Sequence, residues 1–140
     1  MMRGQANLAI PLRAVLLFAG CGGPPSAADR SYVGMPECGG GSVDPDAGES
    51  VAAAWIEKDE SFAIATWGSS SCPAVPTSIE TTDAGGVDVR FDSTTTSGPC
   101  TADMAPTMHD FTVSDDAETV HLVITVRWVD WDQITDLTLE

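Results

Sequence analysis

Short runs that alternate apolar and polar residues constrain the fold of this chain more than any other feature. The longest run covers residues 119–128, and its apolar residues at every second position would share one face of a strand: Val120, Leu122, Ile124, Val126 and Trp128. Further runs of this kind, separated by turn-forming residues, predict strands at residues 51–56, 62–67, 78–81, 87–91, 109–113 and 135–139. No stretch shows a helical period. The sequence therefore predicts an all-β domain, either a small antiparallel β-sandwich or an open barrel.

The first 20 residues have the features of an export signal. Arg3 and Arg13 are basic, no acidic residue precedes Asp29, and residues 14–19 are apolar. This apolar run is too short to cross a bilayer as a permanent helix. The run ends in Leu17-Phe18-Ala19-Gly20-Cys21, which resembles the lipobox of bacterial lipoproteins, with Phe18 where leucine is usual.

The lipobox resemblance implies a lipid anchor at Cys21. In lipoproteins the cysteine thiol takes a diacylglyceryl group and the signal is cut just before it. Two acyl chains such as palmitate hold a protein stably in a membrane. We therefore expect residues 1–20 to be removed and the chain to be anchored at the extracytoplasmic face of the cell membrane. The alternative is an ordinary secretory signal or a buried apolar strand.

Residues 21–50 are rich in Gly, Pro and Ser and offer little to bury, which predicts a flexible tether. Tyr32-Val33-Gly34-Met35 is the one part of it that would suit a short edge strand, but we expect a tether throughout. The β domain is then residues 51–140. A length of about 90 residues permits one modest core.

Two stretches that run into a cysteine beside a proline frame the middle of this domain. They are residues 67–73, which contain Cys72, and residues 98–104, which contain Cys100. With Cys21 acylated, three thiols remain, and they allow three single pairings. We expect a Cys72–Cys100 disulfide, because both lie at strand ends whereas Cys38 lies in the tether.

The charge balance argues against nucleic acid as a partner. The chain has 6 basic and 21 acidic residues. Removal of Arg3 and Arg13 with the signal would leave 4 − 21 = −17. A charge of this sign also opposes docking on anionic lipid.

The sequence contains three candidate functional sites. Ser70 in Gly68-Ser69-Ser70-Ser71-Cys72 is not a nucleophile elbow, because Cys72 stands where the second glycine is needed, so we expect no enzyme. Met104, Met108 and His109 would suit a copper-type metal, although apolar packing is the simpler interpretation of the methionines.

The third candidate is a binding surface of exposed tryptophans. Trp128 and Trp131, together with Trp55 or Trp67, would form a platform for sugar rings or a protein partner if at least two of them were exposed together. Core packing is the more usual role of such residues.

The lipobox, the tether and the two cysteine motifs together resemble a set of small lipoproteins from actinobacteria. The motifs are Trp67-Gly68-Ser69-Ser70-Ser71-Cys72-Pro73 and Gly98-Pro99-Cys100-Thr101-Ala102-Asp103-Met104, the second followed by His109. The resemblance implies the anchor, the compartment and the cysteine pair, and it transfers no catalytic or binding residue. The leading hypothesis is a non-enzymatic module, without a cofactor, that binds an envelope protein or glycan. The alternative is a metal-handling lipoprotein that uses Met104, Met108 and His109.

Overall fold

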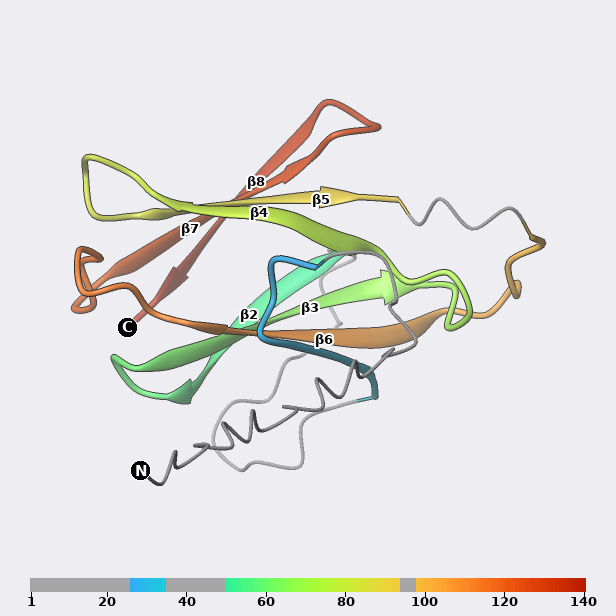
Figure 1. The fold of residues 1–140 in the computed structure, drawn as a ribbon, viewed down its shortest axis with the longest axis horizontal. Helices are drawn as coiled ribbons and strands as arrows, with labels where there is room; N and C mark the ends of the chain where they lie inside the picture. The colour runs from blue at the N-terminus through green and yellow to red at the C-terminus, as the bar shows by residue number, and fades with distance from the viewer. Residues whose placement is uncertain (1–25, 35–49, 94–97) are drawn as a thin grey trace, which may run out of the picture.

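β-Strands joined by turns and loops make up the described part of the chain (Figure 1). The computed structural model describes residues 26–34, 50–93 and 98–140. Within these residues there are eight strands: β1 (Arg30–Val33), β2 (Val51–Glu57), β3 (Ser61–Gly68), β4 (Val75–Thr81), β5 (Val87–Asp92), β6 (Ala105–Thr112), β7 (Leu122–Trp128) and β8 (Gln133–Leu139).

The strands form two four-stranded sheets that pack face to face. Sheet A has the order β1-β6-β3-β2, and sheet B has the order β4-β5-β7-β8. Neighbouring strands are antiparallel except β5 and β7, which are parallel. They are parallel because the chain crosses to sheet A for β6 before it returns to sheet B. The predicted sandwich is confirmed, and the sheets do not close into a barrel.

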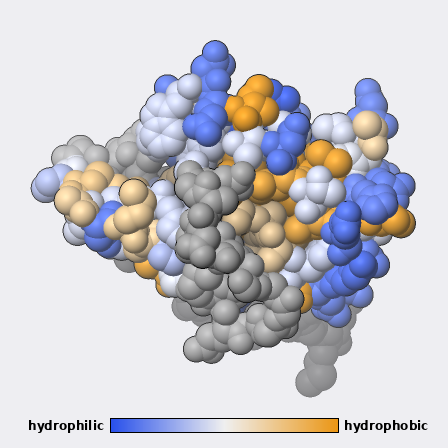
Figure 2. All heavy atoms as spheres, turned by 180° about the vertical axis from the view of Figure 1, so that it is seen from behind, coloured by the Kyte–Doolittle hydropathy of each residue, from blue (hydrophilic) through white to orange (hydrophobic). Residues whose placement is uncertain are grey.

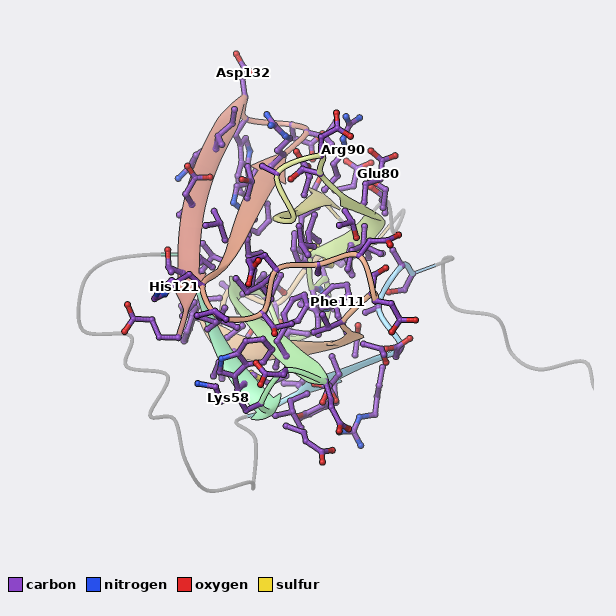
Figure 3. The ribbon with its side chains drawn as sticks, turned by 90° about the vertical axis from the view of Figure 1, so that its left-hand side faces the viewer. Lys58, Glu80, Arg90, Phe111, His121 and Asp132 are labelled. Atoms are coloured by element: carbon purple, nitrogen blue, oxygen red, sulfur yellow. A yellow bond between two sulfur atoms is a disulfide. The ribbon has the colours of Figure 1, made fainter. Side chains whose placement is uncertain are left out.

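The core lies between the two sheets and comes from the inward row of each strand. Sheet B contributes Val89, Phe91 and Ile124, and sheet A contributes Phe62 and Phe111, whose rings stack with centroids 5.3 Å apart. Figure 3 shows the Phe111 side chain in the interior between the sheets. All of these side chains are fully buried, as the period-2 pattern requires.

One inward-facing position of the longest predicted strand is wrong. β7 begins at Leu122 rather than at residue 119, and Val120 is 65% exposed. Residues 120 and 121 form a turn, and just before them the Glu118 amide donates to the carbonyl of Gly85, in the turn between β4 and β5. The apolar alternation continues through this turn, but the strand does not.

Strand β1 lies within the segment that was predicted to be a tether. It pairs with β6 at the edge of sheet A, with Arg30 opposite Asp110 and Tyr32 opposite Met108. An ion pair of 2.6 Å joins Arg30 to Asp110 across this pairing. The structured domain therefore begins before residue 51. Residues 1–25 and 35–49, which include Cys21 and Cys38, lie outside the described residues.

Chain segments at the edges of the two sheets meet on two sides of the sandwich, and the contacts differ between these sides. On one side β2 lies beside β8, and the Trp55 indole Nε1 donates to the Glu140 carbonyl at 3.2 Å. On the other side the chain just before β1 meets β4, where the Ala27 amide donates to the Pro76 carbonyl at 2.8 Å. No helix in the described ranges has the length and apolar content needed to cross a membrane.

Candidate functional site

Cys72 and Cys100 form the predicted disulfide, with their Cα atoms 5.5 Å apart. It joins the loop after β3 to the loop before β6. These loops lie at one end of sheet A, because Gly68 and Ala105 are partners in the β3–β6 ladder. The bridge therefore fixes a pair of loops whose strands are already neighbours.

The serines beside Cys72 have a structural role. The Ser71 hydroxyl accepts a hydrogen bond of 2.9 Å from the Thr101 amide, and the Ser70 amide donates to Asp103 Oδ1 at 3.1 Å. Hydrogen bonds from Ser70 and Thr101 lower the pKa of Asp103 to about 2. The partners of these hydroxyls are Thr101 and Asp103 rather than an imidazole, so the arrangement supports two loops and supplies no base.

The structure does not bring Met104, Met108 and His109 together. Met108 and His109 are consecutive residues of β6, so their side chains point to opposite faces of sheet A. Met108 is buried on the outer face beside Ala63 and Ala65, whereas Met104 is 76% exposed in the preceding loop. Among the residues that the structure describes, no group of three or more His, Cys, Asp or Glu could hold a metal ion.

His109 faces the interior, where both of its ring nitrogens have partners. Nδ1 lies 2.9 Å from Ser31 Oγ, and Nε2 lies 3.1 Å from Thr66 Oγ1. The ring also meets the Phe91 ring edge-on, with centroids 5.0 Å apart. Burial lowers the pKa of His109 to about 4, so the imidazole is neutral at pH 7.

The candidate platform of exposed tryptophans does not form. Trp128 is only 6% exposed and packs on Phe91, with ring centroids 5.3 Å apart. Trp131 is 63% exposed and lies against Trp128 at the same separation. Trp55 and Trp67 are half-buried. Trp131 is therefore the one largely exposed tryptophan, and its inner neighbour belongs to the core.

A hollow of about 300 Å³ lies over one end of sheet B; we call it the sheet B hollow. Four polar residues line it together with apolar ones and a glycine: Thr82, Glu118, His121 and Thr125, with Ala84, Gly86, Val87 and Val123. This volume is at the lower end of the range found for small-ligand sites. Hydroxyl, carboxylate and imidazole groups beside these apolar side chains can form hydrogen bonds with a polar ligand that also has an apolar face.

Two turns shape the sheet B hollow. The Thr82 amide donates to the Gly86 carbonyl at 2.8 Å, and the Glu118 amide donates to the Gly85 carbonyl at the same distance. A Cβ atom at Gly86 would lie 3.0 Å from the Val123 carbonyl oxygen, so a larger residue here would require this backbone to shift. Figure 3 shows His121 at this end of the molecule and Asp132 far from it, at the tip of the β7–β8 hairpin.

A second, smaller hollow lies between the sheets beside β1; we call it the edge hollow. Its volume is about 170 Å³. Ser31, Thr107 and His109 line it from sheet A, and residues 73–76 line it from the β4 side. Ser26, in the chain before β1, also lines it.

No protein-family model, curated protein or solved structure matches this chain. The resemblance to actinobacterial lipoproteins therefore stays a prediction. The site residues have to be judged on geometry and chemistry alone.

Neither hollow could be predicted from the sequence. The sheet B hollow joins residues 82–86 to residues 118–125, and the edge hollow joins β1, β4 and β6. Neither set is contiguous in the sequence. The glycine pair in Asp83-Ala84-Gly85-Gly86 was the only signal for the first, and it indicated a turn rather than a site.

Proposed function

We propose that this chain is a lipoprotein anchored through Cys21 at the extracytoplasmic face of the cell membrane, and that its sandwich is a non-enzymatic module that binds an envelope glycan. The Cys72–Cys100 disulfide carries the assignment of compartment, because such bonds persist in oxidising surroundings. Together with the apolar run that ends at Cys21, it favours export followed by lipidation.

The sheet B hollow supports the binding role. Its polar side chains include both hydrogen-bond donors and acceptors, and Val123, which is 42% exposed, offers an apolar contact for the face of a sugar ring. A neutral ligand fits better than an anionic one, because Glu118 lies at the rim and the whole chain carries a formal charge of −15. Figure 2 shows the molecule from behind, where hydrophilic residues at the upper and right margins lie among hydrophobic ones.

The anchor is tested by localisation. Replacing Cys21 by serine, or treating cells with globomycin, should release or mislocalise the protein. Cys38→Ser is the matched control and should leave it in the membrane. Unchanged membrane retention of the Cys21→Ser variant would exclude lipidation at this residue.

The binding role is tested by native mass spectrometry of the protein recovered from its own envelope. We expect a retained glycan mass that is lost in the Glu118→Gln and His121→Ala variants. Glu80→Gln, another exposed carboxylate of sheet B, is the matched control and should retain it. A spectrum without added mass, or an added mass that survives both hollow variants, would contradict binding at this site.

A further inference from the structure

The outer edge of β1 presents backbone groups that β6 does not use. The Gly34 amide donates to the Pro106 carbonyl at 2.9 Å, and the Val113 amide donates to the Glu60 carbonyl at 2.8 Å. Together with the register, these two bonds show which way the backbone groups of β6 point. Even-numbered residues of β6 form backbone hydrogen bonds with β1, and odd-numbered residues form them with β3. Ser31 and Val33 are therefore in non-hydrogen-bonded pairs.

The amides and carbonyls of Ser31 and Val33 consequently point away from β6, toward the open edge of sheet A. No other described strand pairs with this edge, since β1 is the first strand in the order of the sheet. The side chain of Val33 is 51% exposed there. An open edge with two residues in this orientation offers two donors and two acceptors to another extended chain.

The edge hollow lies where a side chain of an added strand would point. Residues directly opposite each other in a sheet face the same side, and Ser31 faces inward to His109 at 2.9 Å. A residue opposite Ser31 would therefore point between the sheets, into the hollow beside residues 73–76. The volume of about 170 Å³ is below the range of about 300 to 1,000 Å³ for small-molecule sites, but it suits a single side chain.

We propose that the edge of β1 binds an extended peptide, which adds to sheet A as a further strand and places one apolar side chain in the edge hollow. The lining from Ala74, Val75 and Pro76 favours an aliphatic side chain of about the size of leucine. His109 and Ser31 already satisfy each other, so the bound side chain needs no polar group. The formal charge of −15 favours a peptide that is neutral or basic.

This site is separate from the sheet B hollow, and the proposal does not depend on glycan binding or on the anchor. The mode is strand addition, in which backbone hydrogen bonds give affinity and the pocket gives specificity.

Two variants separate the contribution of the backbone hydrogen bonds from that of the pocket. Val33→Pro removes an outward amide without disturbing the pairing with β6, and Ala74→Leu places extra atoms in the hollow.

The test selects random ten-residue peptides, displayed on phage, on the purified full chain in detergent. Selected peptides, made synthetically, should bind the parent chain and bind Val33→Pro and Ala74→Leu at least tenfold more weakly. Val33→Ala is the matched control, because it keeps the amide, and it should change the affinity less than threefold. If Val33→Pro does not fold, backbone N-methylation of the selected peptides should weaken binding at least tenfold in its place.

Five results would overturn the proposal. The first four are failure to enrich any peptide, equal binding to the parent chain and Val33→Pro, equal binding of N-methylated peptides, and a dimer in analytical ultracentrifugation that Val33→Pro abolishes. The dimer would assign the edge to a second copy of the chain. Competition by a synthetic peptide of residues 35–49 that matches the selected peptides would likewise overturn it, in favour of an intramolecular strand. None of these results bears on the glycan mass expected from the sheet B hollow.

Discussion

At the scale of single residues, His109 couples the stability of the fold to pH. Its pKa is lowered from 6.5 to about 4, so between these two values the unfolded chain takes up a proton that the folded chain does not. Stability is therefore fully present above pH 6.5 and falls as the pH drops toward 4. The shift corresponds to a loss on the order of 3 kcal/mol.

The measurement is urea denaturation of the parent chain and of His109→Gln between pH 7 and pH 4. The difference between the two proteins isolates the imidazole from the many carboxylates that titrate at lower pH. We expect the parent chain to lose more stability over this range than the variant. Parallel pH profiles for the two proteins would show that His109 is not buried as described.

Trp128 and Trp131 should differ sharply in their contribution to stability. Trp128→Ala would leave a cavity beside Phe91 and cost about 3 to 5 kcal/mol. Trp131→Ala removes a ring that is 63% exposed, so we expect a cost of about 1 kcal/mol or less. Chemical denaturation of the two variants checks this. Similar losses for both would contradict the different burial of the two rings.

The sequence could not distinguish these residue roles. Alternation correctly placed Trp128 inward, but the same tryptophan was also a candidate for an exposed platform, because the pattern does not say how a turn residue such as Trp131 packs. The nearness of Met108 and His109 in the chain suggested a shared ligand set. Their positions as neighbours on a strand separate them instead.

At the scale of elements, the strands from β2 to β8 were largely predictable and β1 was not. The longer strands have alternating or turn-bounded apolar runs, whereas β1 has four residues and a mostly exposed pattern. Strand β1 is stabilised by its pairing with β6, which is distant in the sequence, and by contacts of the residue just before it. The Thr112 amide and hydroxyl both donate to Asp29 Oδ2, at 2.7 and 2.9 Å. The local signal, Tyr32-Val33-Gly34-Met35, was too short to predict a strand without these long-range partners.

The disulfide is the element-scale feature with the largest expected effect on stability. It links residues 28 positions apart, and closing such a loop in the unfolded chain is worth about 3 kcal/mol. For a domain of about 90 residues, reduction should lower the midpoint of thermal unfolding on the order of 10 to 25 °C. Circular dichroism with and without reductant measures this shift. A reduced protein that melts within about 2 °C of the oxidised one would contradict a stabilising role.

Cys38→Ser is the control for this experiment and should melt at the midpoint of the parent chain. Peptide mapping without reductant provides a second check. It should recover Cys72 joined to Cys100. A peptide that joins Cys38 to either of them would show that the isolated protein has a different pairing.

At the scale of the whole molecule, an acidic domain and the proposed lipid anchor would act in opposite directions at a membrane surface. Without residues 1–20 the chain carries a formal charge of −17, from 4 basic and 21 acidic residues, so the domain itself is repelled by anionic lipid. Two acyl chains on Cys21 would outweigh this repulsion, because each buried methylene contributes about 0.8 kcal/mol. Membrane attachment should therefore depend on the lipid and hardly at all on salt.

Sedimentation with vesicles tests this balance. Lipidated protein should pellet with neutral and with anionic vesicles at both low and high salt. The Cys21→Ser protein should stay in the supernatant in all four conditions, since repulsion is strongest at low salt and screening at high salt adds no attraction. Cys38→Ser should behave as the parent chain does. If the Cys21→Ser protein pellets with anionic vesicles at low salt, a charge-driven contact that the composition does not predict must hold it there, and the anchor would not be the only attachment.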